Sequence, residues 1–119
     1  MTNQIAVFVT LIVTALIVST APSSPPRNVQ SISANSTTVQ LSWQPPLPSS
    51  QNGIIQHYLI HVTEEEAMRQ FELTSSSTSV TVTDLQPYHT YFFTITAVTL
   101  GQGPYSEVIS VRTLEEGEE

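Results

Sequence analysis

The 119-residue chain contains no cysteine and no lysine. Without cysteine it can have no disulfide framework, no thiolate metal site and no cysteine nucleophile. Its three arginines, Arg27, Arg69 and Arg112, lie far apart, and the formal net charge is −7. Because a nucleic-acid partner requires a basic surface facing its phosphates, the composition argues against nucleic-acid binding.

Motifs for catalysis or for cofactor binding are also absent. The sequence has no Gly-x-Ser-x-Gly elbow and no glycine loop that would cradle a phosphate. His57 and His61 share one face of a predicted strand but would lie about 13 Å apart, too far to bind one metal together. We interpret His89 as a turn residue and Glu64–Glu66 as a solvated turn that lacks the pattern of a calcium loop. The sequence therefore predicts no enzyme activity, no cofactor and no metal site.

The N-terminal segment is apolar. The run Ile5–Val18 is interrupted only by two threonines, and it is shorter than the roughly 20 residues of a transmembrane helix. Its length fits the apolar core of a secretory signal, and the small residues Ser19 and Ala21 occupy the positions before a cleavage site, although Pro22 disfavours the cut. We predict that residues 1–21 are a signal peptide or an uncleaved signal anchor; a third interpretation is the last strand of a preceding domain.

The remainder of the chain has the pattern of an all-β protein. Alternation of apolar and polar residues predicts about seven short strands, separated by turn sequences at roughly 8–12-residue spacing, which is typical of a β-sandwich. The intervening loops include Ser49–Gly53, Thr74–Ser79 and Leu100–Tyr105. The predicted strands begin near Asn28, Val39, Tyr58, Phe71, Val80, Tyr91 and Val108.

The most informative stretch is a turn that runs into the sixth predicted strand. Leu85 and Pro87 are followed by Tyr91, which opens an apolar face continued by Phe93. A tyrosine at this place is typical of a tyrosine corner, in which the hydroxyl group hydrogen-bonds to upstream backbone. The predicted structural core is formed by Trp43, Tyr58, Leu85, Tyr91 and Phe93.

Five segments of the chain have a recognisable order, and they are Pro25–Val29, Val39–Pro46, Asn52–Tyr58, Leu85–Ala97 and Gly101–Ser106. Taken together and in this order, they resemble a fibronectin type III domain. The resemblance covers residues 25–114 and implies an all-β, seven-stranded immunoglobulin-like sandwich. An immunoglobulin domain would require cysteine on the second and sixth strands, whereas the sixth strand here carries Phe93.

The predicted organisation has four parts. Residues 1–21 are the signal peptide or anchor, and residues 22–26 are a Pro/Ser linker that proline keeps extended. The fibronectin type III domain spans residues 25–114. Residues 115–119 form an acidic tail, which we expect to be disordered because its charges repel one another.

The resemblance is closest to repeats of cell-adhesion molecules and receptor-type tyrosine phosphatases. It implies a non-catalytic interaction or spacer module, secreted or at the cell surface, that binds protein partners or neighbouring domains. Membrane contact would come only through an uncleaved N-terminal segment. The alternative is an accessory repeat in a fragment of a larger receptor enzyme, such as a receptor-type tyrosine phosphatase.

Two kinds of site are expected. Loops of a rigid sandwich commonly carry binding residues, and the candidate partner-contact loop contains Gly101, Gln102, Gly103 and Tyr105. Asn35 begins an Asn-Ser-Thr sequon, so it is a candidate N-glycosylation site if the chain is exported.

Overall fold

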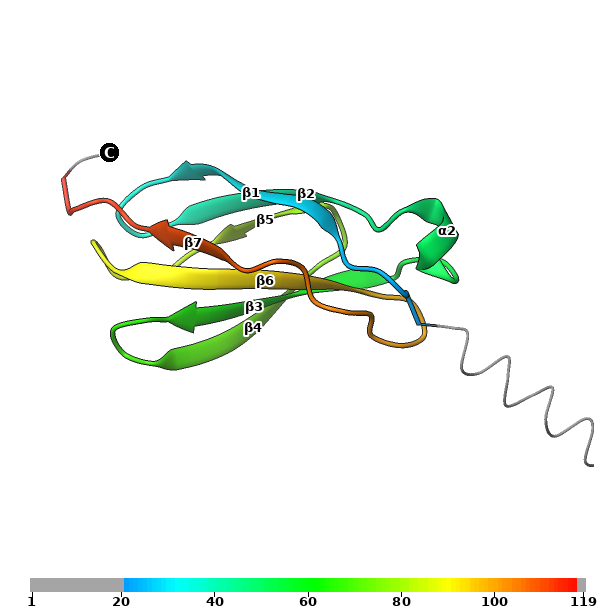
Figure 1. The fold of residues 1–119 in the computed structure, drawn as a ribbon. Coiled ribbons are helices and arrows are strands. Elements are labelled where there is room, and N and C mark those ends of the chain that lie inside the picture. Colours follow the sequence, from blue (N-terminus) through cyan, green and yellow to red (C-terminus); the bar gives the residue numbers. More distant parts are fainter. Residues whose placement is uncertain (1–20, 118–119) are drawn as a thin grey trace, which may run out of the picture.

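The computed structural model describes residues 21–117, so nearly all of the predicted signal segment and the last two tail residues lie outside the described part. Within that part the chain forms the predicted seven β-strands and one short helix (Figure 1). The elements are β1 (Arg27–Ala34), β2 (Val39–Gln44), α2 (Pro48–Gln51), β3 (His57–Glu64), β4 (Arg69–Ser75), β5 (Ser79–Val82), β6 (Thr90–Val98) and β7 (Ile109–Arg112).

The strands form two antiparallel sheets that stack face to face. One sheet has the order β1-β2-β5 and the other the order β4-β3-β6-β7. The central pair, β3 and β6, is in register from His57 opposite Val98 to Glu64 opposite Tyr91. Residues 21–26, which we call the leader, and the end of β7 lie at opposite ends of the sandwich (Figure 1). This architecture confirms the predicted immunoglobulin-like β-sandwich.

The loop between β2 and β3 contains helix α2, where the sequence predicted only a turn. Pro48 occupies the first helical turn, where its missing N–H group costs no hydrogen bond. Asn52 ends the helix in the left-handed conformation, with φ 55° and ψ 39°, which asparagine adopts more readily than most residues. This single turn gives the loop a fixed shape.

Strand β4 is longer than predicted. The sequence indicated a strand around Phe71, but the ladder with β3 runs from Arg69 to Ser75. The apolar pattern did not predict this extension because the residues at both ends of β4 are polar. On an edge strand such side chains need no apolar environment. The predicted loop Thr74–Ser79 is therefore reduced to residues 76–78.

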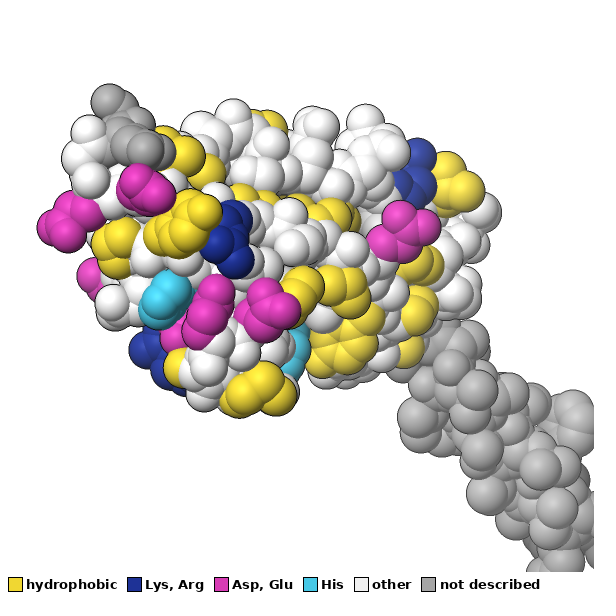
Figure 2. Space-filling model, turned by 60° about the vertical axis from the view of Figure 1, so that its left-hand side comes forward, with side chains coloured by type: hydrophobic (Ala, Val, Ile, Leu, Met, Phe, Trp, Pro, Cys, Tyr) yellow, Lys and Arg dark blue, Asp and Glu magenta, His cyan; other side chains and the backbone are white. Residues whose placement is uncertain are grey.

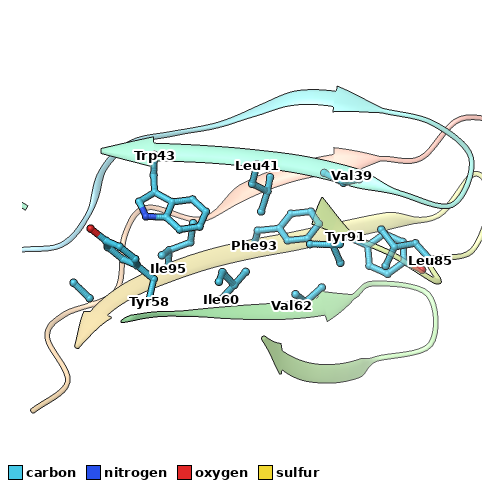
Figure 3. Packing of buried hydrophobic residues seen from close by; sticks show 12 residues of the cluster. Val39, Leu41, Trp43, Tyr58, Ile60, Val62, Leu85, Tyr91, Phe93 and Ile95 are labelled. Carbon is cyan, nitrogen blue, oxygen red and sulfur yellow. The ribbon is translucent and has the colours of Figure 1, made fainter. Parts of the chain in front are cut away.

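The core lies between the sheets (Figure 3). Along β3 buried and half-buried residues alternate, since successive side chains point to opposite faces of a strand. The ring of Trp43 packs edge to face on that of Tyr58, with centroids 5.3 Å apart, and Tyr91 and Phe93 lie side by side along β6. The buried apolar residues are Val39, Leu41, Trp43, Tyr58, Ile60, Val62, Val82, Leu85, Tyr91, Phe93, Ile95 and Ala97.

Trp43 contributes to the stability of this core. We predict that Trp43→Ala lowers the free energy of unfolding by about 3–5 kcal/mol, because it removes a large buried ring and leaves a cavity. Ile32→Ala, at a half-exposed position on β1, is the control and should change the value by less than about 0.5 kcal/mol. Urea unfolding measures both, and equal midpoints for the two variants would contradict the prediction.

Candidate interaction surfaces

The leader packs against the loop that contains α2. The side-chain amide of Asn52 donates a hydrogen bond to the carbonyl oxygen of Ala21 over 2.9 Å. The backbone N–H of Ser23 donates to the carbonyl oxygen of Ser50 over 2.8 Å. These bonds fix the place where the chain enters the domain.

Two glycines of the predicted contact loop also lie close to the leader. A Cβ atom added to Gly101 would lie 3.1 Å from Cβ of Ala21, and one added to Gly103 would lie 2.8 Å from Cβ of Pro22. The second distance is too short for any side chain. Gly103 is therefore required where two segments approach closely, and Gly101 fits tightly, while Gln102 remains exposed.

Tyr105, the fourth residue of the predicted contact loop, lies away from the leader. Its ring packs edge to face against His61, with centroids 6.5 Å apart. His61 is on the outer face of the four-stranded sheet and is half-buried, with Nδ1 4.0 Å from the carboxylate of Glu72. Tyr105 therefore lies against the side of the sandwich.

Through His61, Tyr105 borders the outer face of the four-stranded sheet. Antiparallel pairing places Leu59 and His61 opposite Thr96 and Thr94, so these residues share the outer face of the sheet. Phe92 is half-buried, and Val108 beside the start of β7 is 63% exposed. Figure 2 shows hydrophobic side chains gathered beside a histidine in the lower middle of the molecule. We call this surface the sheet-face patch: Leu59, His61, Phe92, Tyr105 and Val108.

The tyrosine corner has the expected backbone contact. The N–H group of Gln86 donates a hydrogen bond to the hydroxyl oxygen of Tyr91 over 2.8 Å. The same hydroxyl group donates to Oε2 of Glu64, also over 2.8 Å. Burial raises the pKa of Tyr91 above its ordinary value, because the phenolate form would lose its hydration.

The prediction that Glu64 belongs to a solvated turn is wrong. Glu64 is 3% exposed and is the last residue of β3, directly opposite Tyr91 in the register. Its carboxylate also lies 3.6 Å from the guanidinium of Arg69 and 3.9 Å from Nδ1 of His89. A buried carboxylate requires such partners, and none of them is adjacent to Glu64 in the sequence.

Glu66, in the same acidic run, is exposed but has defined partners. The N–H group of Thr90 lies 3.2 Å from both of its carboxylate oxygens, and the guanidinium of Arg112 is 3.8 Å away. Desolvation raises the pKa of Glu66, but the backbone N–H groups of Glu66 and Thr90, helped by His89 and Arg112, lower it more. The net result is a pKa below the ordinary value of a glutamate.

Asn35 is half-buried at the turn between β1 and β2. Its side-chain carbonyl oxygen accepts hydrogen bonds from the N–H groups of Thr37 and Thr38 and from the hydroxyl group of Thr38. This Asx-turn gives Asn35 a structural role, and its glycosylation stays a prediction.

Two observations concern other kinds of site. Within residues 21–117, no group of three His, Asp or Glu side chains is placed to hold a metal ion. In the same part of the chain, no helix has the length and apolar character needed to cross a membrane.

These features define a small immunoglobulin-like sandwich. The model of the fibronectin type III domain family matches residues 24–112. The chain therefore belongs to the fibronectin type III family.

Similarity to curated proteins extends over most of the chain. It is 34% identical over 98 residues to tyrosine-protein phosphatase Lar of Drosophila melanogaster, covering 80% of this chain and 5% of that protein. It is 36% identical over 97 residues to protein sidekick-2 of Gallus gallus, covering 77% and 4%, respectively. With ephrin type-B receptor 6 of Homo sapiens, the identity is 37% over 100 residues, covering 82% and 10%. The chain thus spans a small fraction of these relatives.

Solved structures show the same fold. The third fibronectin III domain of the human KIAA0343 protein superposes with a TM-score of 0.76 at 26% identity, covering 85% of this chain and 90% of that chain. The FN5 domain of Drosophila Lar gives a TM-score of 0.65 at 31% identity, covering 79% and 98%. A complete repeat of such proteins is therefore matched by this single domain.

The buried contact of Tyr91 should be measurable. Tyr91→Phe should lower the free energy of unfolding by about 1–3 kcal/mol, because it leaves the N–H of Gln86 and the carboxylate of Glu64 without their shared partner. In a Glu64→Gln background, Tyr91→Phe should lower the free energy of unfolding by a different amount. A double-mutant cycle measured by urea unfolding should therefore give a coupling energy of about 0.5–3 kcal/mol. Strict additivity would contradict the contact.

Alkaline unfolding gives an independent readout of the same contact. The pKa of Tyr91 is higher in the folded protein than its ordinary value of 10.0, which we take for the unfolded chain. Its contribution to the free energy of unfolding is therefore fully present below the unfolded-state pKa and is lost as the pH rises through the folded-state pKa. In the Tyr91→Phe variant the free energy of unfolding should fall less at alkaline pH. Part of the fall should remain, because the pKa of Tyr58 is also raised.

Proposed function

We propose that this domain is a non-catalytic protein-interaction or spacer module on the extracellular side, either secreted or at the cell surface. Its role would lie in cell adhesion or receptor architecture. The proposal is supported by relatives whose names include receptors and receptor-type phosphatases. In the same proposal, residues 1–21 act as a signal peptide or signal anchor.

The observation that carries the interaction role is the sheet-face patch. Tyr105 is 45% exposed and is held against His61 by an edge-to-face ring contact. A rigid, half-exposed aromatic ring buries a large area on binding at little entropic cost, and tyrosine is therefore enriched at the centres of interfaces. We therefore assign the partner contact to Tyr105 and its neighbours, with the exposed Gln102 at their margin.

A photo-crosslinking experiment tests this assignment. The photoreactive residue benzoylphenylalanine replaces Tyr105 in the full chain expressed on cells. Illumination should yield adducts with a protein partner, because the ring would be buried at the contact. Gel mobility and mass spectrometry detect the adducts.

Ile32 is the matched control for this experiment, since it is an apolar residue of similar exposure on β1 of the other sheet. Benzoylphenylalanine at Ile32 should give few adducts. Equal labelling from both positions, or none from Tyr105, would contradict an interaction through the sheet-face patch.

A second candidate is an accessory repeat within a larger receptor enzyme. It is favoured by the small share of the relatives, 4–10% of their lengths, that the chain matches. An antibody against the domain distinguishes the two candidates by immunoblot of the native tissue. A band near 13 kDa supports the separate module, whereas a much larger protein supports the repeat.

Export predicts glycosylation at Asn35. When the chain is expressed in eukaryotic cells, Thr37→Ala should abolish a mobility shift that peptide N-glycosidase F removes, because the sequon requires Ser or Thr at this position. Thr37→Ser keeps the sequon and is the control. Both variants retain the backbone N–H that closes the Asn35 turn. A wild-type chain that is exported without any shift would show that Asn35 is not an acceptor.

A further inference from the structure

The end of the sandwich where the leader enters carries no ionisable acidic or basic side chain. Its leader and loops, residues 21–26, 45–56, 76–78 and 99–104, contain no Asp, Glu, Lys, Arg or His. The loop 76–78 belongs to this end because the N–H of Trp43 donates to the carbonyl oxygen of Thr78. We call this region the loop end.

The opposite end of the sandwich is highly charged. Its turns and tail contain Glu65, Glu66, Asp84 and Glu115. In Figure 2 most of the charged side chains in view gather on the left-hand part of the molecule. Arg27, His57 and Glu107 border the loop end, and Arg27 and Glu107, which have opposite signs, line the same groove between β1 and β7. The negative charge of the chain is therefore concentrated far from the loop end.

Three large apolar side chains protrude from the loop end. Leu47 is 49% exposed, Ile54 is 80% exposed and Leu100 is 85% exposed. We call these three residues the apolar tip. Single exposed apolar residues are ordinary, but a group of them on an uncharged surface marks an interaction site.

The leader brings two residues of the apolar tip together. Ile54 lies two residues after Asn52, which donates a hydrogen bond to Ala21, and Leu100 directly precedes Gly101, which packs against Ala21. The N–H group of Gln56 also donates to the carbonyl oxygen of Val98 over 2.7 Å, linking the two loops. Ile54 and Leu100 therefore flank the entry point of the chain.

The sequence places a second apolar element at the same point. The apolar run Ile5–Val18 ends three residues before Ala21. Only Ser19 and Thr20 separate this run from Ala21, the first residue of the chain's entry into the domain. The chain thus connects a strongly apolar run to an apolar, uncharged surface by a very short link.

We propose that the apolar tip rests on a lipid bilayer. The proposal depends on the signal-anchor form of the N-terminal segment, in which residues 1–21 are retained and the apolar run enters the membrane. Leu47, Ile54 and Leu100 would then enter the region between headgroups and acyl chains, as apolar side chains at membrane interfaces do. The acidic end points away from the bilayer, and contact requires no anionic lipid.

The absence of cysteine makes this orientation directly measurable. Single variants Ile54→Cys and Leu100→Cys of the full chain are labelled with a nitrobenzoxadiazole dye and reconstituted into phosphatidylcholine vesicles. The emission of both dyes should shift to the blue and be quenched by lipids that carry a nitroxide. Met68→Cys, an exposed apolar position at the charged end, is the matched control and should show neither effect.

Each other outcome overturns the proposal. If the chain floats with the vesicles but the dyes at Ile54 and Leu100 are quenched no more than the dye at Met68, the anchor holds and the tip contact fails. A chain that does not float refutes both. A blue shift at Leu100 that disappears when lipid dilutes the protein would show that a second copy covers the tip. Crosslinking from Tyr105 is read separately, so these results do not decide the proposed partner contact.

Discussion

Apolar packing between the two sheets is the interaction on which the rest of this structure depends. The chain has no cysteine, so no disulfide joins the sheets, and their adhesion comes from side chains that meet across the interior. Trp43 of β2 reaches across to Tyr58 of β3, and Tyr91 and Phe93 continue the same layer along β6. The loops and their surfaces are positioned because this layer holds both sheets rigidly.

The corner adds a polar constraint at the charged end of the core. The hydroxyl group of Tyr91 has two hydrogen-bond partners, the N–H of Gln86 and the carboxylate of Glu64. The first partner fixes the turn before β6, and the second gives a buried charge a donor that it would otherwise lack. Arg69 and His89 lie near the same carboxylate. At this end of the sandwich an acidic side chain is therefore buried, with two basic side chains beside it.

The two ends of the sandwich therefore differ in chemistry, and this difference organises its surfaces. At one end, charged turns surround the C-terminal part of the described chain. At the other, uncharged loops hold the leader through Asn52 and two close-packed glycines. The sheet-face patch around Tyr105 lies on the side between them. A module held at its loop end would leave that side open to a protein partner.

By itself the sequence determined the class of fold and the strands that face the core. Alternation along the chain is a short-range signal, and it sufficed to place Trp43 and Phe93 inside and to identify the tyrosine corner. Alternation along β3 also puts position 64 on the inward face, but it could not reveal the partner that allows a carboxylate to be buried there, since Tyr91 is distant in sequence. Only the tertiary structure brought the leader against Gly103 and gathered Leu47, Ile54 and Leu100 at one end. These contacts join segments whose approach is set by the packing of the sheets, and no local pattern records that approach.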